Sequence, residues 1–563
     1  MEKHFMIRLP AVILLVSFLF LNKAYSLVDM NNASYSNTWI DLEVPGNGYE
    51  MKVIRAYKSR TIFNGIFGFG WCSEFETKLE PTSEGNIKIS ECGDGQEIVF
   101  SAKEITKKDI DATISAVITK MKADPKVKAS SPDYWKKIAD QMSYEDELRA
   151  KLAKTYSVAV PIKEGTKFSA NGKEVENVIF NKTYYTRNLP DGSYQRFDLQ
   201  GRLISMYDKN NNFLKFEYDK DLLKEVEDNN SRKLAFKYFP NKKVKTITGP
   251  NGLVTEYKYS AQEDLIWNKN AWAKTDKHIY KYEYNEFHNL TKASWPDDTS
   301  VVVRYDNVKD WVVSFTDRDK CGEIYKYEFS PTDPEFHYWS SVTKTCGKEV
   351  VANNRYEFWH KKIDSGQVVL SRVLTNVSGS TTDITYHDTF GKPVVIKKNN
   401  DRMNFEYFSD GLVKSKQAGN AKLEFSHDPQ TKKVSTVKAI VTNEKGKVVS
   451  TRQTTFKYDG KGNLSYAENN DGQKVTITYD AKGRISSITD QAKKIVKIDY
   501  EDRFGKPSVV TRPGLGTIKV SYKPNGDIAK VDSAEGPTVA SQVASTFNNL
   551  LDVISPATQE LYL

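Results

Sequence analysis

The stretch YDGKGNLSYAENNDGQKVTITYDAKGRISSITD, from Tyr458 to Asp490, contains the same phrase twice, 21 residues apart. In both copies a Tyr-Asp pair is followed, after two residues, by glycine, then by a polar and an apolar residue. The aspartate can accept hydrogen bonds from turn amides, and the glycine adopts a positive φ without steric cost. We therefore assign the repeat turns to Tyr458, Asp459, Gly462, Tyr479, Asp480 and Gly483.

The residues between these turns alternate between apolar and polar, as in Lys474–Tyr479. Alternation with a period of two predicts a strand, so each repeat is a β-hairpin. Tyrosines recur at steps of 20 to 22 residues through much of residues 180–535, which is typical of a repeat architecture. The sequence predicts a mainly β protein: a long antiparallel meander of roughly thirty strands that must curl to bury one face.

This phrase and its spacing resemble the YD repeat of bacterial Rhs proteins and of the related teneurins. The segment from Arg55 to Phe100, with R-x-Y-x-S-R and G-x-F-G-x-G-W, is similar to the N-terminal domain that precedes such repeats. The resemblance implies strands that spiral into a hollow shell, which in polymorphic toxins encloses a C-terminal toxin. The family's Asp-Pro-x-Gly-Leu self-cleavage motif has no match, and the residues after the repeats are too few for a toxin domain. We expect a partial shell or an open, coiled sheet.

The chain divides into five segments. We expect a signal peptide at 1–26, an N-terminal Rhs-associated β domain at 28–100, a helical insertion at 104–157, the YD-repeat spiral at 180–535, and a C-terminal capping helix at 538–563. The insertion has apolar residues at helical spacing, and we expect it to bury them against the body it interrupts. Binding a partner is the alternative for the insertion, and lying on a membrane is the alternative for the C-terminal helix. The glycines between Phe63 and Trp71 do not match a nucleotide-binding loop and predict a tight backbone crossing packed by aromatic rings.

The first residues predict export. A basic start is followed by the short apolar run Ala11–Leu21 and by small residues at the −3 and −1 positions of a cleavage site after Ser26. An uncleaved N-terminal anchor is the alternative. We expect the protein in the periplasm, at the cell surface or outside the cell.

Four cysteines agree with an oxidising compartment. They are Cys72, Cys92, Cys321 and Cys346. Of the three pairings that four cysteines allow, we favour the two local pairs, because either spacing could return the chain to a neighbouring strand. Four buried free thiols are the alternative. A zinc site is not expected, since no Cys-x-x-Cys is present and no histidine lies near either pair.

No motif indicates catalysis. The seven histidines do not cluster with Cys, Ser or Asp at a known spacing, and Asp208-x-Asn210-x-Asn212 lacks the glycine of a calcium loop. We therefore assign no catalytic, cofactor-binding or metal-binding residue and no cofactor. The net charge of +9 is spread over 563 residues and indicates ordinary solubility. Attraction to acidic surfaces such as anionic glycans or lipid headgroups is the alternative, and no nucleic-acid partner is expected.

The sequence leads to one functional hypothesis and two alternatives. The hypothesis is an exported, non-enzymatic scaffold of the bacterial envelope or exterior that binds or encapsulates a partner, either a protein cargo or a surface glycan. The first alternative is an Rhs-type toxin remnant or a carrier for a separately encoded cargo. The second is a glycan-active enzyme. Peripheral membrane contact and the oligomeric state stay open.

Overall fold

The structure is a computed structural model that describes most of the chain. The described residues are 27–44, 46–82, 85–91, 97–102, 105–127, 131–158, 162–170, 172–173, 175–271, 279–363, 367–523, 526–533 and 553. The expected signal peptide with its cleavage after Ser26, Cys92, and the expected C-terminal helix apart from Val553 lie outside the described residues.

One 33-stranded sheet dominates the fold, and each of its strands, β10 to β42, pairs antiparallel with the next strand in sequence. The predicted meander is therefore confirmed. We call β10–β25 the lower turn: β10 (Lys167–Ser169), β11 (Asn177–Phe180), β12 (Tyr184–Asn188), β13 (Tyr194–Asp198), β14 (Leu203–Tyr207), β15 (Phe213–Asp219), β16 (Leu222–Asp228), β17 (Lys233–Tyr238), β18 (Val244–Thr248), β19 (Val254–Tyr259), β20 (Leu265–Lys269), β21 (Ile279–Tyr284), β22 (Leu290–Ser294), β23 (Ser300–Tyr305), β24 (Val312–Thr316) and β25 (Gly322–Phe329).

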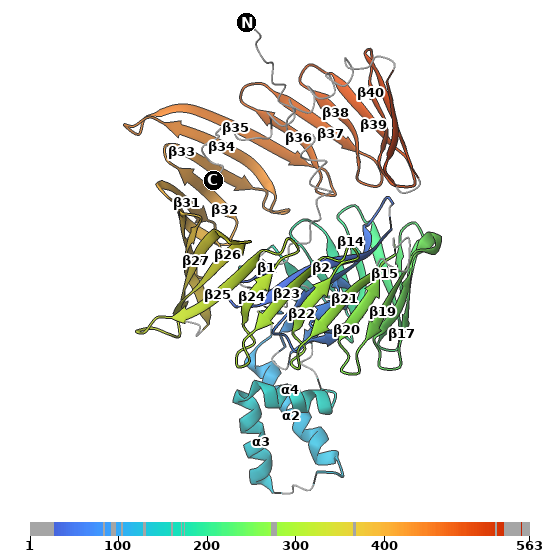
Figure 1. The fold of residues 1–563 in the computed structure, drawn as a ribbon, viewed down its shortest axis with the longest axis vertical. Coiled ribbons are helices and arrows are strands. Elements are labelled where there is room, and N and C mark those ends of the chain that lie inside the picture. Colours follow the sequence, from blue (N-terminus) through green and yellow to red (C-terminus); the bar gives the residue numbers. More distant parts are fainter. Residues whose placement is uncertain are drawn as a thin grey trace.

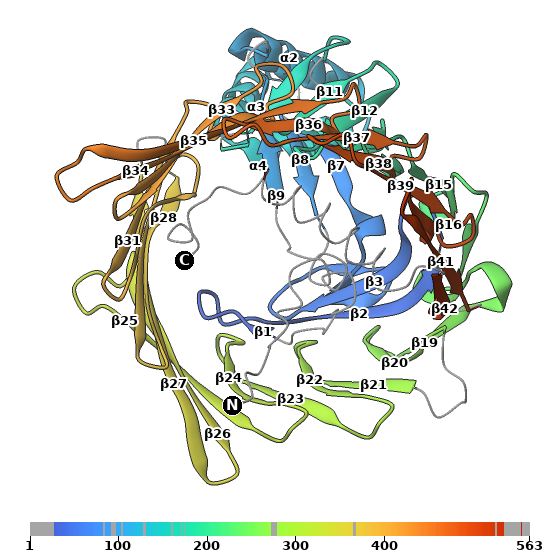
Figure 2. The ribbon, with the colours of Figure 1, turned by 90° about the horizontal axis from the view of Figure 1, so that it is seen from above.

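We call β26–β42 the upper turn: β26 (His337–Cys346), β27 (Glu349–Lys362), β28 (Val368–Val377), β29 (Ser380–Tyr386), β30 (Pro393–Lys398), β31 (Asp401–Tyr407), β32 (Val413–Ala418), β33 (Ala421–His427), β34 (Val434–Thr442), β35 (Val448–Tyr458), β36 (Leu464–Asn469), β37 (Lys474–Tyr479), β38 (Ile485–Asp490), β39 (Ile495–Tyr500), β40 (Pro507–Arg512), β41 (Gly516–Tyr522) and β42 (Ile528–Ser533). Seen from above, the strands run around a ring, and the upper turn passes over the start of the lower turn (Figures 1 and 2). The sheet is therefore a spiral that overlaps itself and does not close into a barrel.

The turn of each repeat is built by its aspartate and glycine. Asp480 Oδ1 accepts hydrogen bonds from the backbone N–H groups of Lys482 and Arg484, both at 2.9 Å. Gly483 has a φ of +81°, a value at which a side chain would be strained. These contacts satisfy the turn amides locally, so the phrase specifies a hairpin without help from distant residues.

The tyrosine of the repeat completes the strand ladder. The pairing between β36 and β37 reaches only to Tyr466 and Thr476, so the Leu464 carbonyl lies beyond its end. The Tyr479 hydroxyl donates a hydrogen bond to that carbonyl at 2.8 Å. The same bond, to a carbonyl 15 residues earlier, is made by Tyr218, Tyr238, Tyr305, Tyr327, Tyr500 and Tyr522.

The upper turn of the spiral contacts the lower turn through the loops that connect the strands of its hairpins. Asn463 Nδ2 donates to Asn210 Oδ1 at 3.0 Å, and Asn212 Nδ2 donates to the Lys482 carbonyl at 3.2 Å. These contacts join residues 253 and 270 positions apart. We call this meeting of residues 208–212 with 459–463 and 480–484 the seam.

The N-terminal β domain lies inside the ring of the lower turn (Figure 2). It forms a sheet in the order β1-β2-β3-β6, a small hairpin β4-β5 and a sheet β7-β8-β9. Its strands are β1 (Leu27–Val28), β2 (Tyr35–Val44), β3 (Met51–Lys58), β4 (Asn64–Gly65), β5 (Gly68–Phe69), β6 (Trp71–Cys72), β7 (Lys78–Pro81), β8 (Ile87–Ser90) and β9 (Glu97–Phe100), with a 3₁₀ turn at Glu74–Glu76; a second 3₁₀ turn, Pro250–Gly252, lies between β18 and β19.

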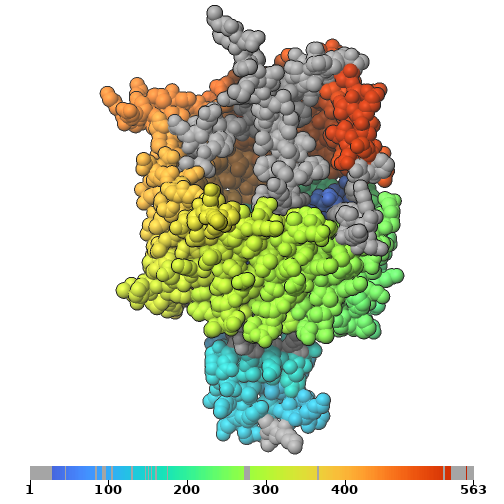
Figure 3. Space-filling model, in the orientation of Figure 1, coloured from blue at the N-terminus to red at the C-terminus, as the bar shows by residue number. Residues whose placement is uncertain are grey.

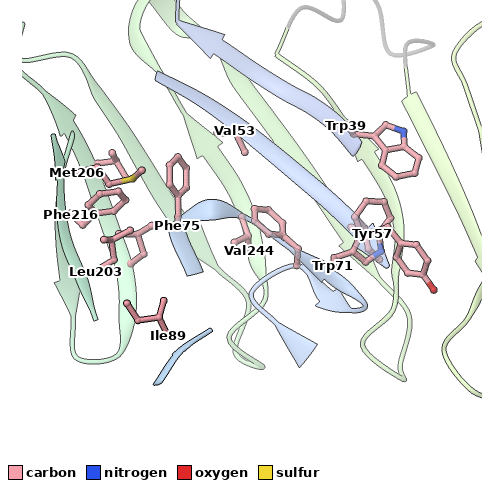
Figure 4. Close-up of a cluster of buried hydrophobic side chains, with 14 of the residues drawn as sticks. Trp39, Val53, Tyr57, Trp71, Phe75, Ile89, Leu203, Met206, Phe216 and Val244 are labelled. Carbon is pink, nitrogen blue, oxygen red and sulfur yellow. The ribbon is translucent and has the colours of Figure 1, made fainter. Parts of the chain in front are cut away.

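The core lies between this domain and the ring. Trp71 and Phe75 of the domain pack in one cluster with Leu203, Phe216 and Val244 of the lower turn (Figure 4). Backbone bonds also cross the boundary: the Val244 N–H donates to the Ile66 carbonyl at 2.9 Å. The domain therefore fills the lower turn as a plug that shares its hydrophobic core.

The helical insertion comprises α2 (Lys107–Ala123), α3 (Pro132–Tyr144) and α4 (Asp146–Thr155). It projects below the ring (Figures 1 and 3). Its apolar side chains, including Ile114, Val117 and Met142, form a cluster separate from the main core. The expectation that they pack against the body is wrong, because three helices provide enough apolar surface to cover one another. In the described part of the chain, no helix combines the length and the apolar character that crossing a bilayer requires.

Candidate functional site

The inner face of the spiral is the surface that carries the repeat tyrosines. In the lower turn, Tyr257 and Tyr282 reach the N-terminal domain, where their hydroxyls contact Asp41 and Arg55. Because side chains two residues apart share a face, Val475, Ile477 and Tyr479 of β37 lie on the same inner face of the upper turn. The space enclosed by the spiral, which we call the lumen, is therefore lined by the repeat tyrosines. The residues two and four positions before each of these tyrosines also line it.

A buried ion pair anchors the plug in the lower turn. Arg55 and Asp41 are 0% and 1% exposed, and Arg55 Nη2 lies 2.9 Å from Asp41 Oδ1. The Tyr257 hydroxyl donates to Asp41 Oδ2 at 2.7 Å, and Arg55 Nη2 donates to Asn268 Oδ1 at 3.1 Å. Burial alone would lower the pKa of Arg55, but the Asp41 carboxylate outweighs it and raises that pKa. Both charges belong to the plug, so their hydrogen bonds to Asn268, Tyr282 and Tyr257 are what hold it to the wall. These bonds are lost if the plug shifts, which leaves buried polar groups unsatisfied and so favours one orientation.

The glycine-rich loop brings the plug close to the wall. A Cβ on Gly68 would lie 2.5 Å from the Glu263 carbonyl oxygen, and one on Gly70 would lie 2.6 Å from the Tyr57 ring. Beside this loop, the Trp71 Nε1–H donates to the Tyr284 hydroxyl at 2.7 Å. The loop is a tight crossing packed by aromatic rings, as its composition predicts.

Two carboxylates of the plug have strongly raised pKa values. Burial raises the pKa of Glu76 to about 7, although the N–H groups of Ile66 and Ser73 donate to it. Burial, followed by repulsion from Glu50, raises the pKa of Glu74 to about 7. The Glu76 contacts hold the Gly-rich loop to the 3₁₀ turn, so this carboxylate has a structural role in the plug.

The inner face of β30–β34 is apolar. Met403, Ala421, Leu423 and Ala439 are buried there and pack with neighbouring apolar side chains of the same five strands. No described residue of the plug or the helices belongs to this cluster. Burial lowers the pKa of Lys416, which lies on this face beside Phe405. The upper turn thus has an apolar inner surface in which Met403 and Leu423 are buried, while Ile396, Phe405, Phe425 and Val437 stay partly exposed.

A second apolar cluster lies further along the upper turn. Ala467, Val475, Ile477 and Ile488 of β36–β38 pack around Val553, which is 1% exposed. The Thr454 Oγ1 hydroxyl donates to the Val553 carbonyl at 3.2 Å. Val553 therefore packs against the inner face of the repeat in which the Tyr-Asp phrase is most regular.

Cys321 and Cys346 form a disulfide between the adjacent strands β25 and β26. This is one of the two local pairs that the spacing predicts. Cys72 is also disulfide-bonded. Because Cys92 lies outside the described residues, the pair Cys72–Cys92 stays a prediction.

The half-buried tryptophans Trp339 and Trp359 of the outer face are already stacked. Trp359 lies between its cross-strand neighbours His337, at 4.6 Å between ring centroids, and Arg372, whose guanidinium carbon is 4.5 Å from the ring centroid. The Arg355 guanidinium carbon lies 4.6 Å from the centroid of the Trp339 ring. These rings form a ladder across β26–β28 and are not free platforms for sugar rings.

The repeat turns line a groove of about 510 Å³ that contains two carboxylates, Asp459 and Asp480. Both act as turn caps: Asp459 Oδ1 accepts from the N–H groups of Lys461 and Asn463, just as Asp480 does in its own turn. Burial would raise the pKa of Asp459, but these hydrogen bonds outweigh it and lower that pKa. The carboxylates of Asp459 and Asp480 therefore lack the difference in pKa that a glycosidase needs between its acid and its nucleophile.

Histidines contact carboxylates at two places. His288 Nδ1 lies 2.8 Å from Asp264, with Phe69 stacked on the ring, and His337 Nε2 lies 2.7 Å from Glu357. Asp208, the start of the rejected calcium loop, caps its own turn through the Asn212 N–H. Among the described residues, no group of three or more His, Cys, Asp or Glu side chains could hold a metal ion.

Sequence reasoning missed the Asp41–Arg55 network. A signal was present: in Met51–Lys58 the residues at every second position are buried, and Arg55 occupies one of these positions. A charged residue on the apolar face of a strand indicates a buried partner. The charge partner, Asp41, lies 14 residues earlier in the paired strand, but Asn268, which completes the network, lies 213 residues away and could not be named.

Comparison with protein families identifies the repeat region. The family model named Teneurin YD-shell matches residues 191–563, more than half of the chain. The chain belongs to the teneurin YD-shell family. A second model, a domain of unknown function named DUF6531, matches residues 26–100, which include the strands of the plug. The helices α2–α4 lie between the two matched regions.

Solved structures similar to this YD-shell chain are much longer. The TcdB2-TccC3-TEV structure matches with a TM-score of 0.42 and 12% identity over 94% of this chain and 29% of that one. A Photorhabdus luminescens Tc holotoxin pore with the mutation TccC3-D651A matches with a TM-score of 0.41 and 11% identity over 90% and 28%. No curated protein matches. Membership of the YD-shell family therefore rests on the family model and on the repeat geometry.

Proposed function

We propose that this chain is an exported, non-catalytic YD-shell protein that encloses a polypeptide against the inner face of its upper turn. The observation that carries the proposal is the apolar surface of β30–β34, where Ile396, Phe405, Phe425 and Val437 stay partly exposed around a buried centre. A single sheet layer with an apolar face is stabilised when a second layer covers that face. In the lower turn the plug supplies that layer, and in the upper turn an enclosed polypeptide would supply it.

Export is part of the proposal. The Cys321–Cys346 disulfide is consistent with folding in an oxidising compartment. The basic and apolar start of residues 1–26 supplies a route out of the cytoplasm.

The test is purification from the native host followed by mass spectrometry of what elutes with the shell. We expect a separate polypeptide that resists added protease until the shell is unfolded. Phe425→Asp places a charge on the partly exposed inner face and should abolish retention, because an unpaired buried charge opposes association. Lys422→Asp, on the outer face of the same strand, is the matched control and should retain the partner.

Two outcomes would count against this function. Retention of the partner by Phe425→Asp would place the partner elsewhere on the molecule. Turnover of a glycan that is lost on changing one carboxylate would favour the glycan-active alternative over a non-catalytic shell.

A further inference from the structure

The two ends of the 33-stranded sheet differ. At the first edge, β10 is bridged to the plug: the Ser101 N–H donates to the Ser169 carbonyl at 2.8 Å, and the Ser169 N–H donates back at 2.9 Å. At the last edge, β42 pairs with β41 and with no other strand of the described residues. An open edge presents a row of backbone N–H and C=O groups that another strand can pair with.

The side chains of β42 lack the cover that equivalent residues have elsewhere. Val531 lies opposite Val520, as Ile488 lies opposite Ile477 two repeat units earlier in the spiral. Ile488 is fully buried, whereas Val531 is 56% exposed. Ile488 also pairs with Val496 of the following strand, a neighbour that no described residue provides for Val531. Among the described residues, the sheet therefore ends with an interior-type residue at its edge.

The order of residues in β42 makes the strand complementary to itself. Two copies of Ile-Ala-Lys-Val-Asp-Ser, aligned antiparallel about Val531, place Lys530 opposite Asp532 of the other copy, and the reverse, on the outer face. The two valines meet on the inner face. In one chain Lys530 and Asp532 already lie 2.7 Å apart on one side of the strand and are 69% and 56% exposed. This two-fold arrangement is the closed symmetry expected of a homodimer.

We propose that β42 is a dimerisation edge and that it pairs antiparallel with β42 of a second copy of this chain, in the register centred on Val531. Main-chain hydrogen bonds would supply affinity, and the two Lys530–Asp532 pairs would select the register. The proposal is independent of the enclosed polypeptide, because β42 lies beyond the apolar cluster of β30–β34.

The test measures the mass of the full chain in solution by light scattering during size-exclusion chromatography, over a range of concentrations. We expect a species of twice the mass of one chain. Lys530→Asp places like charges opposite each other twice and should raise the dimer dissociation constant about tenfold. Adding Asp532→Lys to that variant restores both pairs and should restore the dimer.

Lys497→Asp is the matched control, since Lys497 is exposed on β39, a strand paired on both sides. This variant should leave the dimer unchanged. A chain that stays monomeric at all concentrations would overturn the proposal. A dimer that is indifferent to Lys530→Asp, or that the double change does not restore, would overturn the pairing of β42.

Discussion

The buried ion pair of the plug allows a quantitative prediction. Asp41→Asn removes the negative charge with little change in volume and leaves the fully buried Arg55 guanidinium without a counter-ion. It weakens the contacts that Asp41 makes with Arg55, Tyr257 and Asn268. Removing one partner of a buried pair costs about 3–5 kcal/mol, so the free energy of unfolding should fall by that amount.

The assay is urea unfolding followed by tryptophan fluorescence. The centroid of the Trp71 ring lies 4.4 Å from the Arg55 guanidinium carbon, so the fluorescence of this side chain reports the packing of the plug. The control is Glu43→Gln in the same strand. Glu43 pairs with Lys52 at 3.7 Å but is 44% exposed, so its loss should cost less than about 1 kcal/mol.

A second variant separates the lost charge from the lost packing. Asp41→Asn combined with Arg55→Met removes both charges and keeps an apolar side chain beside Trp71. Much of the stability lost in Asp41→Asn should return, because no buried charge is left unpaired. If Asp41→Asn costs no more than Glu43→Gln, the reasoning from buried charge is refuted.

Three further predictions concern the repeat, the Gly-rich loop and the plug. Tyr479→Phe removes the hydroxyl that donates to Leu464 and should lower the free energy of unfolding by about 0.5–1.5 kcal/mol in the same urea assay. Gly68→Ala places a Cβ 2.5 Å from the Glu263 carbonyl oxygen at a φ of +95°, and should lower the melting temperature through both clash and backbone strain. Glu76 has a pKa raised from 4.5 to about 7, so the unfolded chain loses its proton first and stability should fall as pH rises from about 4.5 to about 7; Glu76→Gln should reduce this fall in melting curves taken across that range.

Each of these predictions has its own control or contrary result. Tyr466→Phe, on the exposed side of β36, should cost less than Tyr479→Phe, and an equal cost would remove the special role of the inner-face hydroxyl. Gly446→Ala shares a positive φ of +74° but meets nothing within 4 Å, so it isolates strain from clash. An unchanged pH dependence in Glu76→Gln would show that this carboxylate does not titrate between pH 4.5 and 7.

The local features of the fold could be predicted, because short contacts specify them. Asp480 and Gly483 make their turn within five residues, and the strands between turns alternate visibly. The seam between the two turns of the spiral could not be predicted in the same way. Asn210 and Asn463 meet only because a particular number of strands separates them along the spiral, and nothing about either asparagine marks it in the sequence.

The prediction of how the helices pack was wrong for another reason. Periodicity correctly indicated which residues of α2 are buried, such as Ile114 and Val117. It did not indicate which surface covers them. That surface is supplied by α3 and α4, so the insertion has a small core of its own. The candidate site shows the same limit: the apolar face of β30–β34 could be read from alternation, and its position inside the ring could not.

The contacts at the seam fix the number of repeats in one part of the chain and leave the number free in another part. Deleting one two-stranded hairpin between residues 212 and 459 would move the Asn463 turn about 10 Å along the ring, so that it would no longer face Asn210. Insertions and deletions in that interval are therefore expected in sets that restore the match. Repeats added after Ser533 leave the Asn210–Asn463 contact and the Asn47–Asp502 contact in place, so related shells can differ in length beyond that point while the overlap of the two turns is preserved.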